Sequence, residues 1–462
     1  MLAAETYTER REKLSSLLES GLVLLMGNEE SPINFRDNPY PFRQDSSFLY
    51  YLGLDQPGMA ALVDVDEGYC TLFGHEPTLD EIVWTGSLPT LSERGADVGI
   101  EDCRAAEELA DHLSVALQGG RTIHFLPTYR DSTTLRIAHL LEIPSADVDK
   151  IASQDLVRAV VAQRSIKSPE EVEEIRVAVD LAWQIHTLAM RMARPGMKEQ
   201  EVVGAIEGLL ISQGSATSFP IIFTVRGEVL HNHSHGYVMQ EEDFAILDAG
   251  AVSPSYYASD ITRTFPVGGS FATHQREIYE IVLGAQLSAI KAVVPGISFE
   301  EIHLLASREL AEGLHNLGIL RGNVEDAVAQ GAHALFFPHG LGHMMGLDVH
   351  DMESLGEDLV GYDDSVSRST QFGRSYLRLA KRVEAGHVLT VEPGLYFIPQ
   401  LIDSWAKDHR LAEFIDYEKL EDWKGFGGVR IEDNLVVTAG GHEVLGKPIP
   451  KTVAEVEDLT SD

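Results

Sequence analysis

The first 160 residues show a mixed pattern of apolar and polar positions. Residues 5–20 have the spacing of a helix, whereas the short apolar runs at 21–27 and 60–65 are typical of buried strands. Glycine and proline separate these segments. The pattern predicts a small α/β domain over residues 1–160.

A different pattern begins near residue 165, where a strong helix-start signal precedes a long apolar stripe. Ser168 suits an N-cap, Pro169 suits the first helical position, and Glu171 can complete a capping box. One helical face then carries the apolar residues Val172, Ile175, Val179, Ala182 and Ile185. We expect this helix to open a second domain that spans residues 161–462.

The second domain contains a short internal sequence repeat. PGMKEQEV at 195–202 recurs as PGISFEEI at 295–302, and each copy follows one helical pattern and opens another. Each half also supplies two acidic residues in strand-like apolar surroundings, namely Asp248 and Asp260, and Glu392 and Glu432. Two similar halves with a site between them explain both observations. The expected fold class is α+β, with a pseudo-symmetric C-terminal domain behind the smaller α/β domain.

Five residues in short, distinctive strings carry the candidate chemistry. The strings are ILDAG, SDITRTFP, HGLGH, TVEPG and GGVRIEDN, and they contain Asp248, Asp260, His343, Glu392 and Glu432. Buried carboxylates in such number would be desolvated and would repel one another. Two divalent cations would neutralise them, so the pattern predicts a dinuclear metal site. Oxygen-rich ligation with one nitrogen favours Mn²⁺, with Co²⁺ or Zn²⁺ as alternatives.

The local sequence also predicts how these side chains are presented. Asp248 closes an apolar strand and Asp260 opens the return strand, so a hairpin is expected to bring the two carboxylates side by side. Arg430 and Glu432 alternate with an isoleucine and are expected on one face of a strand. The proline after Glu392 holds that residue extended.

Histidines gather in two segments. His339, His343 and His350 lie within twelve residues of a Gly-rich stretch that is not expected to be helical. The tract HNHSH at 231–235 alternates as on one face of a strand, which would suit a further metal site. We favour a simpler interpretation, in which His231 lines the cleft beside the Asp248 strand.

Composition narrows the class of partner. There are 72 acidic and 36 basic residues, a net charge of −36, which argues against nucleic acid and anionic membranes as partners. No run of eighteen apolar residues occurs, and the N-terminus carries charge where a signal peptide needs an apolar stretch. The two cysteines, Cys70 and Cys103, give no disulfide framework. We therefore expect a cytoplasmic protein.

Taken together, the strings resemble those of the pita-bread (creatinase/aminopeptidase) metallopeptidases, in particular the aminopeptidase P and prolidase branch. NPYPFRQ at 38–44 and SFLYYLG at 47–53 resemble the N-terminal domain of that branch, which methionine aminopeptidases lack. The resemblance implies a metallopeptidase with a proline-containing peptide as substrate, assembled as a homodimer or homotetramer. It also implies that all five residues are metal ligands, and it assigns substrate-side or supporting roles to His231, His339, His350 and Arg430.

The resemblance favours an Xaa-Pro dipeptidase (prolidase) over an Xaa-Pro aminopeptidase acting on longer peptides. An insertion between Glu392 and Glu432 looks more like prolidase, and Arg378 matches an arginine that binds the carboxylate of a dipeptide there. In contrast, Trp84 in VWTG resembles a substrate-side tryptophan of aminopeptidase P. A metal-free binding protein of the same fold is a remote alternative, because all five ligand positions are kept.

The expected reaction is hydrolysis of the Xaa-Pro bond at a peptide N-terminus by a hydroxide that both metals share. Glu392 is expected to serve as ligand and as proton shuttle to the prolyl nitrogen. His350 or His231 would stabilise the oxyanion, and His339 would orient the substrate. Arg430 would hold the ligand carboxylates in register.

Overall fold

The computed structural model describes residues 2–461 and divides into two compact units. The first contains the chain up to Arg164 together with Met352–Leu359, and the second contains Ser165–Asp351 and the chain from Val360 onward. The domain boundary expected at 160/161 lies inside helix α8 (Gln154–Ser165), and the units divide one turn later. The return of Met352–Leu359 to the first unit has no signal in the local sequence.

The N-terminal unit is built on a mixed five-stranded sheet with the order β4-β3-β2-β1-β5. β1 pairs antiparallel with β2 and parallel with β5, and every residue of β1 is buried, which explains its continuous apolar sequence. The strands are β1 (Leu22–Met26), β2 (Ala60–Asp64), β3 (Tyr69–Gly74), β4 (Asp102–Ala105) and β5 (Ile123–His124). The two predicted strands in this region are confirmed as β1 and β2.

Helices surround this sheet and close its core, in which Leu24, Leu62, Phe73, Leu113 and Phe125 pack together. The helices are α1 (Ala4–Ser16), α2 (Ser46–Leu52), α3 (Leu79–Thr85), α4 (Leu91–Asp97), α5 (Glu108–Gln118), α6 (Asp131–Leu140) and α7 (Val148–Ile151), followed by α8. One of them is unusual, because α3 buries none of its residues and Trp84 on it is 86% exposed.

The second unit opens with α9 (Pro169–Met192), which starts as its sequence predicts. The Ser168 side chain accepts from the Glu171 N–H, the Glu171 carboxylate accepts from the Ser168 N–H, and Pro169 is the first helical residue. α10 and a three-stranded sheet follow in the first half, which consists of α10 (Glu199–Ser212), β6 (Ile222–Thr224), β7 (Phe244–Asp248) and β8 (Thr262–Pro266).

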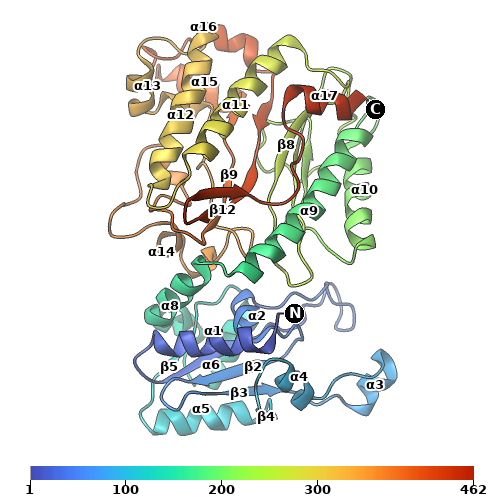
Figure 1. Cartoon of the computed structure of the whole chain (residues 1–462), viewed down its shortest axis with the longest axis vertical. Coiled ribbons are helices and arrows are strands. Elements are labelled where there is room, and N and C mark those ends of the chain that lie inside the picture. Colours follow the sequence, from blue (N-terminus) through green and yellow to red (C-terminus); the bar gives the residue numbers. More distant parts are fainter. Residues whose placement is uncertain (1, 462) are drawn as a thin grey trace. The chain divides into compact units, whose positions relative to one another are not determined.

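The second half repeats this plan. It has two long helices and a three-stranded sheet with the order β13-β12-β9. Its elements are α11 (Thr273–Ala292), α12 (Phe299–Asn316), β9 (Val388–Val391), β12 (Asp433–Thr438) and β13 (Gly441–Val444). Figure 1 shows α11 and α12 side by side in one half, and α9 and α10 in the other.

The Pro-Gly repeat lies in equivalent turns of the two halves. Gly196 and Gly296 have φ values of +91° and +87°, in the left-handed region that favours glycine. Lys198 forms a β-bridge with Val238, and Ser298 forms one with Arg382. The pseudo-symmetric α+β fold is therefore confirmed at the level of single turns.

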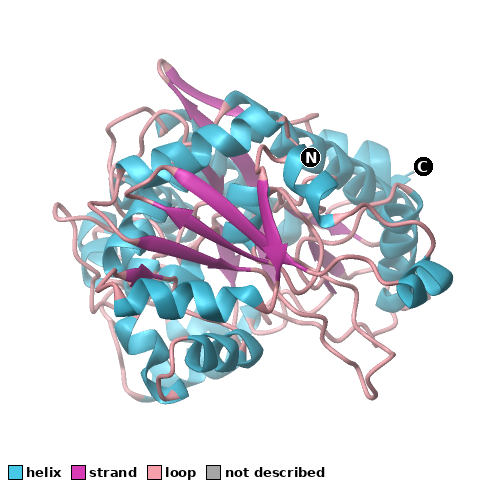
Figure 2. Ribbon diagram, turned by 90° about the horizontal axis from the view of Figure 1, so that it is seen from below, coloured by secondary structure: helices cyan, strands magenta, loops and turns pink. Residues whose placement is uncertain are grey.

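The remaining elements fill the end of the chain and the connections. They are α13 (Val324–Gln330), α14 (Glu357–Gly361), α15 (Pro399–Lys407), α16 (Tyr417–Leu420), α17 (Val453–Ser461), β10 (Gly394–Tyr396) and β11 (Gly428–Arg430). Helices flank the strands in Figure 2. Within residues 2–461, every helix is either too short or too polar to cross a membrane.

The two halves are joined where β8 meets the segment between β11 and β12. The Thr264 hydroxyl donates to the Arg430 carbonyl, and the Glu432 N–H donates to the Thr262 carbonyl. The single strand expected across Arg430 and Glu432 is wrong in detail. The chain leaves the β10–β11 pair after Arg430 and enters the β9–β12–β13 sheet at Asp433, so Glu432 lies in the switch between two sheets.

Candidate metal centre

A narrow hairpin presents the first two carboxylates. Asp248 is the last residue of β7 and pairs with Thr262, and Asp260 lies two residues before β8. The hairpin can be this narrow because residue 250 is glycine, since a Cβ there would overlap the Ser259 carbonyl. Asp248 and Asp260 therefore offer oxygens to the same small group, as the sequence predicts.

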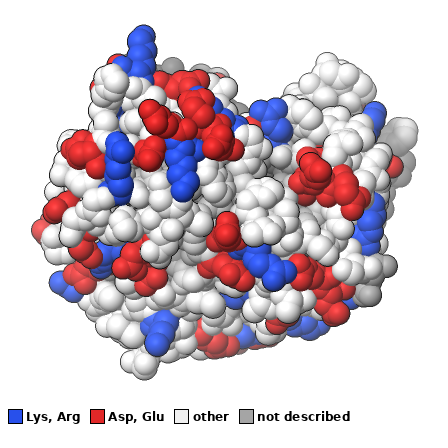
Figure 3. Space-filling model, turned by 90° about the horizontal axis from the view of Figure 1, so that it is seen from above, with Lys and Arg blue, Asp and Glu red and all other residues white. Residues whose placement is uncertain are grey.

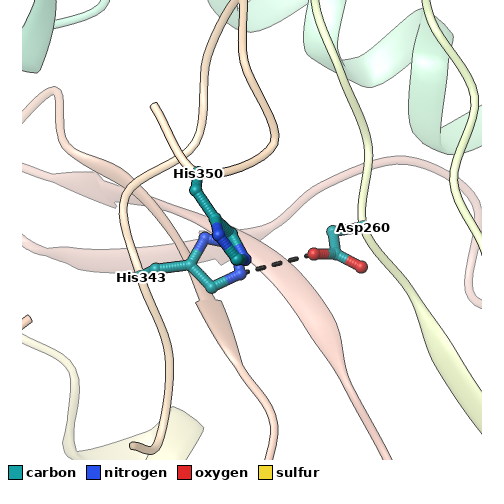
Figure 4. Close-up of side chains that lie close together, drawn as sticks. All are labelled: Asp260, His343 and His350. Atoms are coloured by element: carbon teal, nitrogen blue, oxygen red, sulfur yellow. Dashed lines mark ion pairs between the residues drawn. The ribbon is translucent and has the colours of Figure 1, made fainter. Parts of the chain in front are cut away.

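His343 approaches these carboxylates from the Gly-rich segment, which is non-helical as expected. Its Nε2 lies 3.3 Å from an Asp260 oxygen and 3.6 Å from a Glu392 oxygen. Nδ1 lies 3.1 Å from the Met344 carbonyl, which can only accept, so Nδ1 carries the proton in the neutral ring. Nε2 then points a lone pair at the carboxylates, an arrangement suited to a shared cation. Figure 4 shows His343, His350 and Asp260 converging.

The five predicted ligands, together with His350, form three overlapping groups in which the ligand atoms lie within 4.8 Å of one another. These are Asp248, Asp260 and Glu432; His343, Glu392 and Glu432; and Asp260, His343 and His350. The chain thus brings together all five positions chosen from the sequence. It also places His350 close enough to belong to a ligand group, with its ring centroid 4.2 Å from that of His343.

The electrostatics of this cluster are unfavourable without a counter-ion. Burial, followed by repulsion from neighbouring carboxylates, raises the pKa of Asp260 and of Glu432 well above the usual range. Burial also raises the pKa of Glu392. Three buried oxygens of the candidate ligands have no hydrogen-bond partner within the described residues 2–461, namely Asp248 Oδ1, Asp260 Oδ1 and Glu432 Oε1. Unpartnered carboxylate oxygens that face one another fit the coordination of divalent cations.

Arg430 provides the fixed positive charge of the site. Its guanidinium donates to Asp248 Oδ2, to the Thr262 hydroxyl at 3.0 Å and to the Tyr396 hydroxyl at 2.8 Å. Burial alone would lower the pKa of Arg430, but Tyr396, Asp248 and the two ligand glutamates raise it. One guanidinium cannot balance four carboxylates, so Arg430 orients the site without neutralising it.

Three supporting residues carry no signal that was recognised in the sequence. The Thr262 hydroxyl donates to Glu432 at 2.7 Å, and the Asn434 side chain accepts from the Asp260 N–H at 3.0 Å. The Tyr396 hydroxyl lies 3.0 Å from His339 Nε2, and burial raises the pKa of Tyr396 to about 12. Asn434 lies in the GGVRIEDN string and could have been singled out, whereas no spacing rule points to Tyr396.

The other candidate residues lie at different distances from the cluster. His339 Nδ1 is 3.9 Å from Glu392, and its pKa is lowered to about 3, by burial first and then by Arg430, with a smaller effect of Arg378. His231 lies in the connection between β6 and β7. Desolvation lowers its pKa most, and the charge of Arg430 lowers it further. Trp84 belongs to the N-terminal unit, and its substrate role stays a prediction.

The tract at 231–235 does not gather into a metal site. The three groups found among residues 2–461 contain none of its histidines. His235 instead places Nδ1 3.1 Å from the Phe223 carbonyl, a structural contact. The position of His231 in the lining of the cleft stays a prediction.

An apolar cleft of about 570 Å³ adjoins His339. Its wall combines the turn before β7, the segment before Arg378 and the insertion that contains α15. The lining residues are Leu230, Pro338, His339, Phe372, Tyr376, Ile398, Gln400, Leu401 and Ser404. The cleft thus offers an apolar surface next to the cluster of ligand side chains.

Residues 173–439, more than half of the chain, match the family described as "Metallopeptidase family M24". The chain belongs to metallopeptidase family M24. Residues 7–124 also match the "Aminopeptidase P, N-terminal domain". All five predicted ligand positions lie within the matched M24 region, so the family assignment and the geometry concern the same residues.

Relatives of this M24 chain carry two kinds of name. The human "Xaa-Pro dipeptidase" is 33% identical over 469 residues, covering 99% of this chain and 92% of that protein. The "Probable Xaa-Pro aminopeptidase pepP" of Aspergillus clavatus is 31% identical, covering 96% and 93%. Among solved structures, Escherichia coli aminopeptidase P in complex with substrate aligns with a TM-score of 0.82 at 30% identity, covering 100% of this chain and 98% of that one.

Proposed function

We propose that this M24 peptidase hydrolyses the Xaa-Pro bond at the N-terminus of proline-containing peptides, and that it is an Xaa-Pro dipeptidase. The observation that carries the proposal is the buried group of carboxylates with three unpartnered oxygens around His343. A metal-free binding protein of this fold would have no reason to keep these groups facing one another. The human relative named Xaa-Pro dipeptidase supports the choice of substrate.

The ligands of two divalent cations would be Asp248, Asp260, His343, Glu392 and Glu432. When bound, these cations supply Lewis acidity and lower the pKa of a water molecule. Mn²⁺ suits a mainly oxygen donor set, and a neighbouring structure titled "Zn substituted E. coli Aminopeptidase P in complex with product" supports Zn²⁺ as an alternative.

Each supporting side chain then has a proposed task. Glu392, 3.9 Å from His339, takes a proton from water and delivers it to the leaving prolyl nitrogen. His350 or His231 stabilises the developing oxyanion, and His339 orients the substrate from the wall of the apolar cleft. Arg430 keeps the Asp248 carboxylate in place through their ion pair.

One feature of the chain supports a dipeptide as substrate, and another supports a longer peptide. The dipeptidase proposal rests on Arg378, which we propose to lie on the substrate side; its charge is one of the smaller causes of the lowered pKa of His339. The aminopeptidase alternative is supported by the cleft of about 570 Å³, because it exceeds what one proline ring fills. The similarity to Escherichia coli aminopeptidase P, solved with the inhibitor Pro-Leu among others, points the same way.

Two further properties are part of the proposal. We propose a homodimer or homotetramer, which would cover the exposed apolar side chains of Leu79, Val83 and Trp84 on α3. We also propose that the protein works in a reducing compartment such as the cytoplasm, since Cys70 and Cys103 are free thiols. On the face shown in Figure 3, acidic side chains form several separate groups, which suits a small peptide better than a polyanion as partner.

The test compares three substrates with the Mn²⁺-loaded protein: an Ala-Pro dipeptide, an Ala-Pro-Gly tripeptide and an Ala-Ala dipeptide. Hydrolysis of Ala-Pro with a higher kcat/KM than Ala-Pro-Gly supports the dipeptidase, and the reverse order supports the aminopeptidase. No cleavage of either prolyl substrate, with two equivalents of metal bound, would overturn the proposed activity. The Ala-Ala dipeptide shows whether proline is required.

A further inference from the structure

A fully buried ion pair lies outside the groups that could hold a metal. Lys167 Nζ is 2.8 Å from Asp351 Oδ2, and both side chains are only 1% exposed. Removing two charges from water costs several kcal/mol for each ion, so such a pair is poor evidence for stability. It is better explained by a need to hold two segments in one definite arrangement.

Asp351 closes the loop that follows His343. Its N–H donates to the Met344 carbonyl at 3.0 Å, and its Oδ1 accepts from the Asp348 N–H at 3.4 Å. The carboxylate fits because residue 346 is glycine, since a Cβ there would overlap it. Asp351 is also the residue directly after His350. The ion pair therefore fixes a loop, residues 344–351, with a site histidine at each end.

Lys167 anchors this loop to the start of β9, the strand that Glu392 follows directly. The Lys167 N–H donates to the Gly386 carbonyl at 2.9 Å, two residues before β9. The loop itself reaches the same strand, because the Met345 N–H donates to the Val388 carbonyl at 2.9 Å. Lys167 thus connects the His350 side of the site to the Glu392 side through one side chain and one backbone bond.

The Lys167–Asp351 ion pair affects the site through the position of His350. His350 offers a ring nitrogen within 4.8 Å of the ligand atoms of Asp260 and His343. A displacement of about 1 Å in such a group is enough to cost on the order of a hundredfold in rate. Resting on the proposed peptidase activity, we propose that Lys167 is a positioning residue, which acts through Asp351 to fix loop 344–351 and so to place His350 against His343 and Asp260.

If Lys167 had only a structural role, different results would be expected, and two variants separate the two roles. Lys167→Met removes the cation that pairs with the buried Asp351 carboxylate and should lower both stability and kcat. The double variant Lys167→Met/Asp351→Asn removes both charges, so stability should recover. If the pair positions His350, kcat of the double variant stays about ten- to a hundredfold below wild type, with KM changed less than kcat and with full metal content. Recovery of kcat together with stability would overturn the proposal.

A double-mutant cycle tests whether Lys167 acts through His350. In a His350→Ala background the positioned group is gone, so Lys167→Met should lower kcat little further. If the losses in kcat of the two single variants multiply in the double variant, Lys167 works independently of His350 and the proposal is overturned. The matched control is Arg121→Met in the N-terminal unit, where Arg121 pairs at 2.6 Å with Asp64, which is 2% exposed. This control should lower stability without changing kcat.

A measurement that needs no substrate separates failure of this inference from failure of the proposed activity. The visible absorption spectrum of the Co²⁺-loaded protein reports the geometry around the metals, including that of His343, which directly precedes loop 344–351. We expect Lys167→Met to change this spectrum and Arg121→Met to leave it unchanged. A spectrum identical to wild type in Lys167→Met, at equal Co²⁺ content, would sink the positioning role even if no peptide is cleaved.

Discussion

Two carboxylates that are adjacent in the sequence, Glu432 and Asp433, have pKa values shifted in opposite directions. Burial alone would raise the pKa of Asp433, but Arg263 and Lys451 hold it well below the usual range. Glu432, the adjacent residue, has a raised pKa because burial and the other site carboxylates outweigh Arg430. Basic side chains of the protein balance the charge of Asp433, whereas the charge of Glu432 is left for a bound cation to balance. This difference distinguishes a structural carboxylate from a ligand-binding one.

Neutralising one ligand should therefore remove function without harming the fold. We expect Asp260→Asn and Glu432→Gln to bind less metal and to lose more than about a hundredfold in activity, since losing even a supporting partner of a ligand costs that much. The metal-free variants should be at least as resistant to thermal unfolding as metal-free wild type, because a repelling buried charge is gone. Full activity of either variant at near-stoichiometric metal would contradict the two-metal site.

Arg378 gives a second prediction, which separates the two substrate lengths. If its guanidinium binds the carboxylate of a dipeptide, Arg378→Ala removes a charge-assisted pair of about 1.5–3 kcal/mol. The kcat/KM for Ala-Pro should then fall by about one to two orders of magnitude. Ala-Pro-Gly, whose carboxylate lies one residue further out, should lose much less. Equal losses on both substrates, or none, would leave the aminopeptidase as the better description.

At the scale of elements, the site depends on how closely two chain segments approach. The β7–β8 hairpin brings Asp248 beside Asp260 only because the backbone at 250 and at 259 nearly touch. The joined sheets then add Glu432 through the Glu432 N–H bond to the Thr262 carbonyl. Short elements, each three to six residues long, hold the carboxylates in place.

A glycine substitution in the hairpin should show this dependence. Gly250→Ala places a Cβ against the Ser259 carbonyl, a backbone atom that cannot move without opening the hairpin. We expect a loss of about 1–3 kcal/mol in unfolding free energy and weaker metal binding, measured by denaturant unfolding and by calorimetric titration. Gly208→Ala in α10, where nothing lies within 4 Å of the added Cβ, is the control. It should instead stabilise by about 0.5–1 kcal/mol.

The sequence predicted those elements and residues whose cause is local. The α9 start, the hairpin and the ligand strings could be identified because capping, strand alternation and distinctive motifs lie within a few positions of one another. The strand break at Glu432 and the role of Tyr396 could not, because both depend on which distant segment lies alongside. The return of Met352–Leu359 to the first unit is long-range in the same way. Only contacts between remote parts of the chain decide such features.

At the scale of the whole molecule, several buried histidines are held neutral. Burial lowers the pKa of His186 and His387 to about 3 and that of His333 to about 4, from a usual value of 6.5. Between these values and 6.5 the unfolded chain binds protons that the folded chain does not. Stability is therefore complete above pH 6.5 and is lost as the pH falls toward the folded pKa. Acid sensitivity should begin at a pH where most carboxylates are still ionised.

His387 allows this sensitivity to be measured at one position. Its Nδ1 accepts from the Glu384 N–H, and the Oδ1 of asparagine can take over that bond in His387→Asn. From pH 6.5 to about pH 5, wild type should lose about 2 kcal/mol of unfolding free energy relative to the variant, at about 1.4 kcal/mol per pH unit. Parallel pH profiles of the two metal-free proteins would show that His387 is not held neutral.

The order of the ligands along the chain has a consequence for synthesis in the cell. Asp248 and Asp260 are made first, and Glu432 follows 170 residues after Thr262, the residue whose hydroxyl it accepts from. At about 5–20 residues per second, a ribosome needs on the order of ten to thirty seconds to cover that stretch. Throughout that time the nascent chain holds only part of the donor set. Metal loading must therefore wait until Glu432 has been translated, so the supply of free cation matters only after both halves of the site have been made.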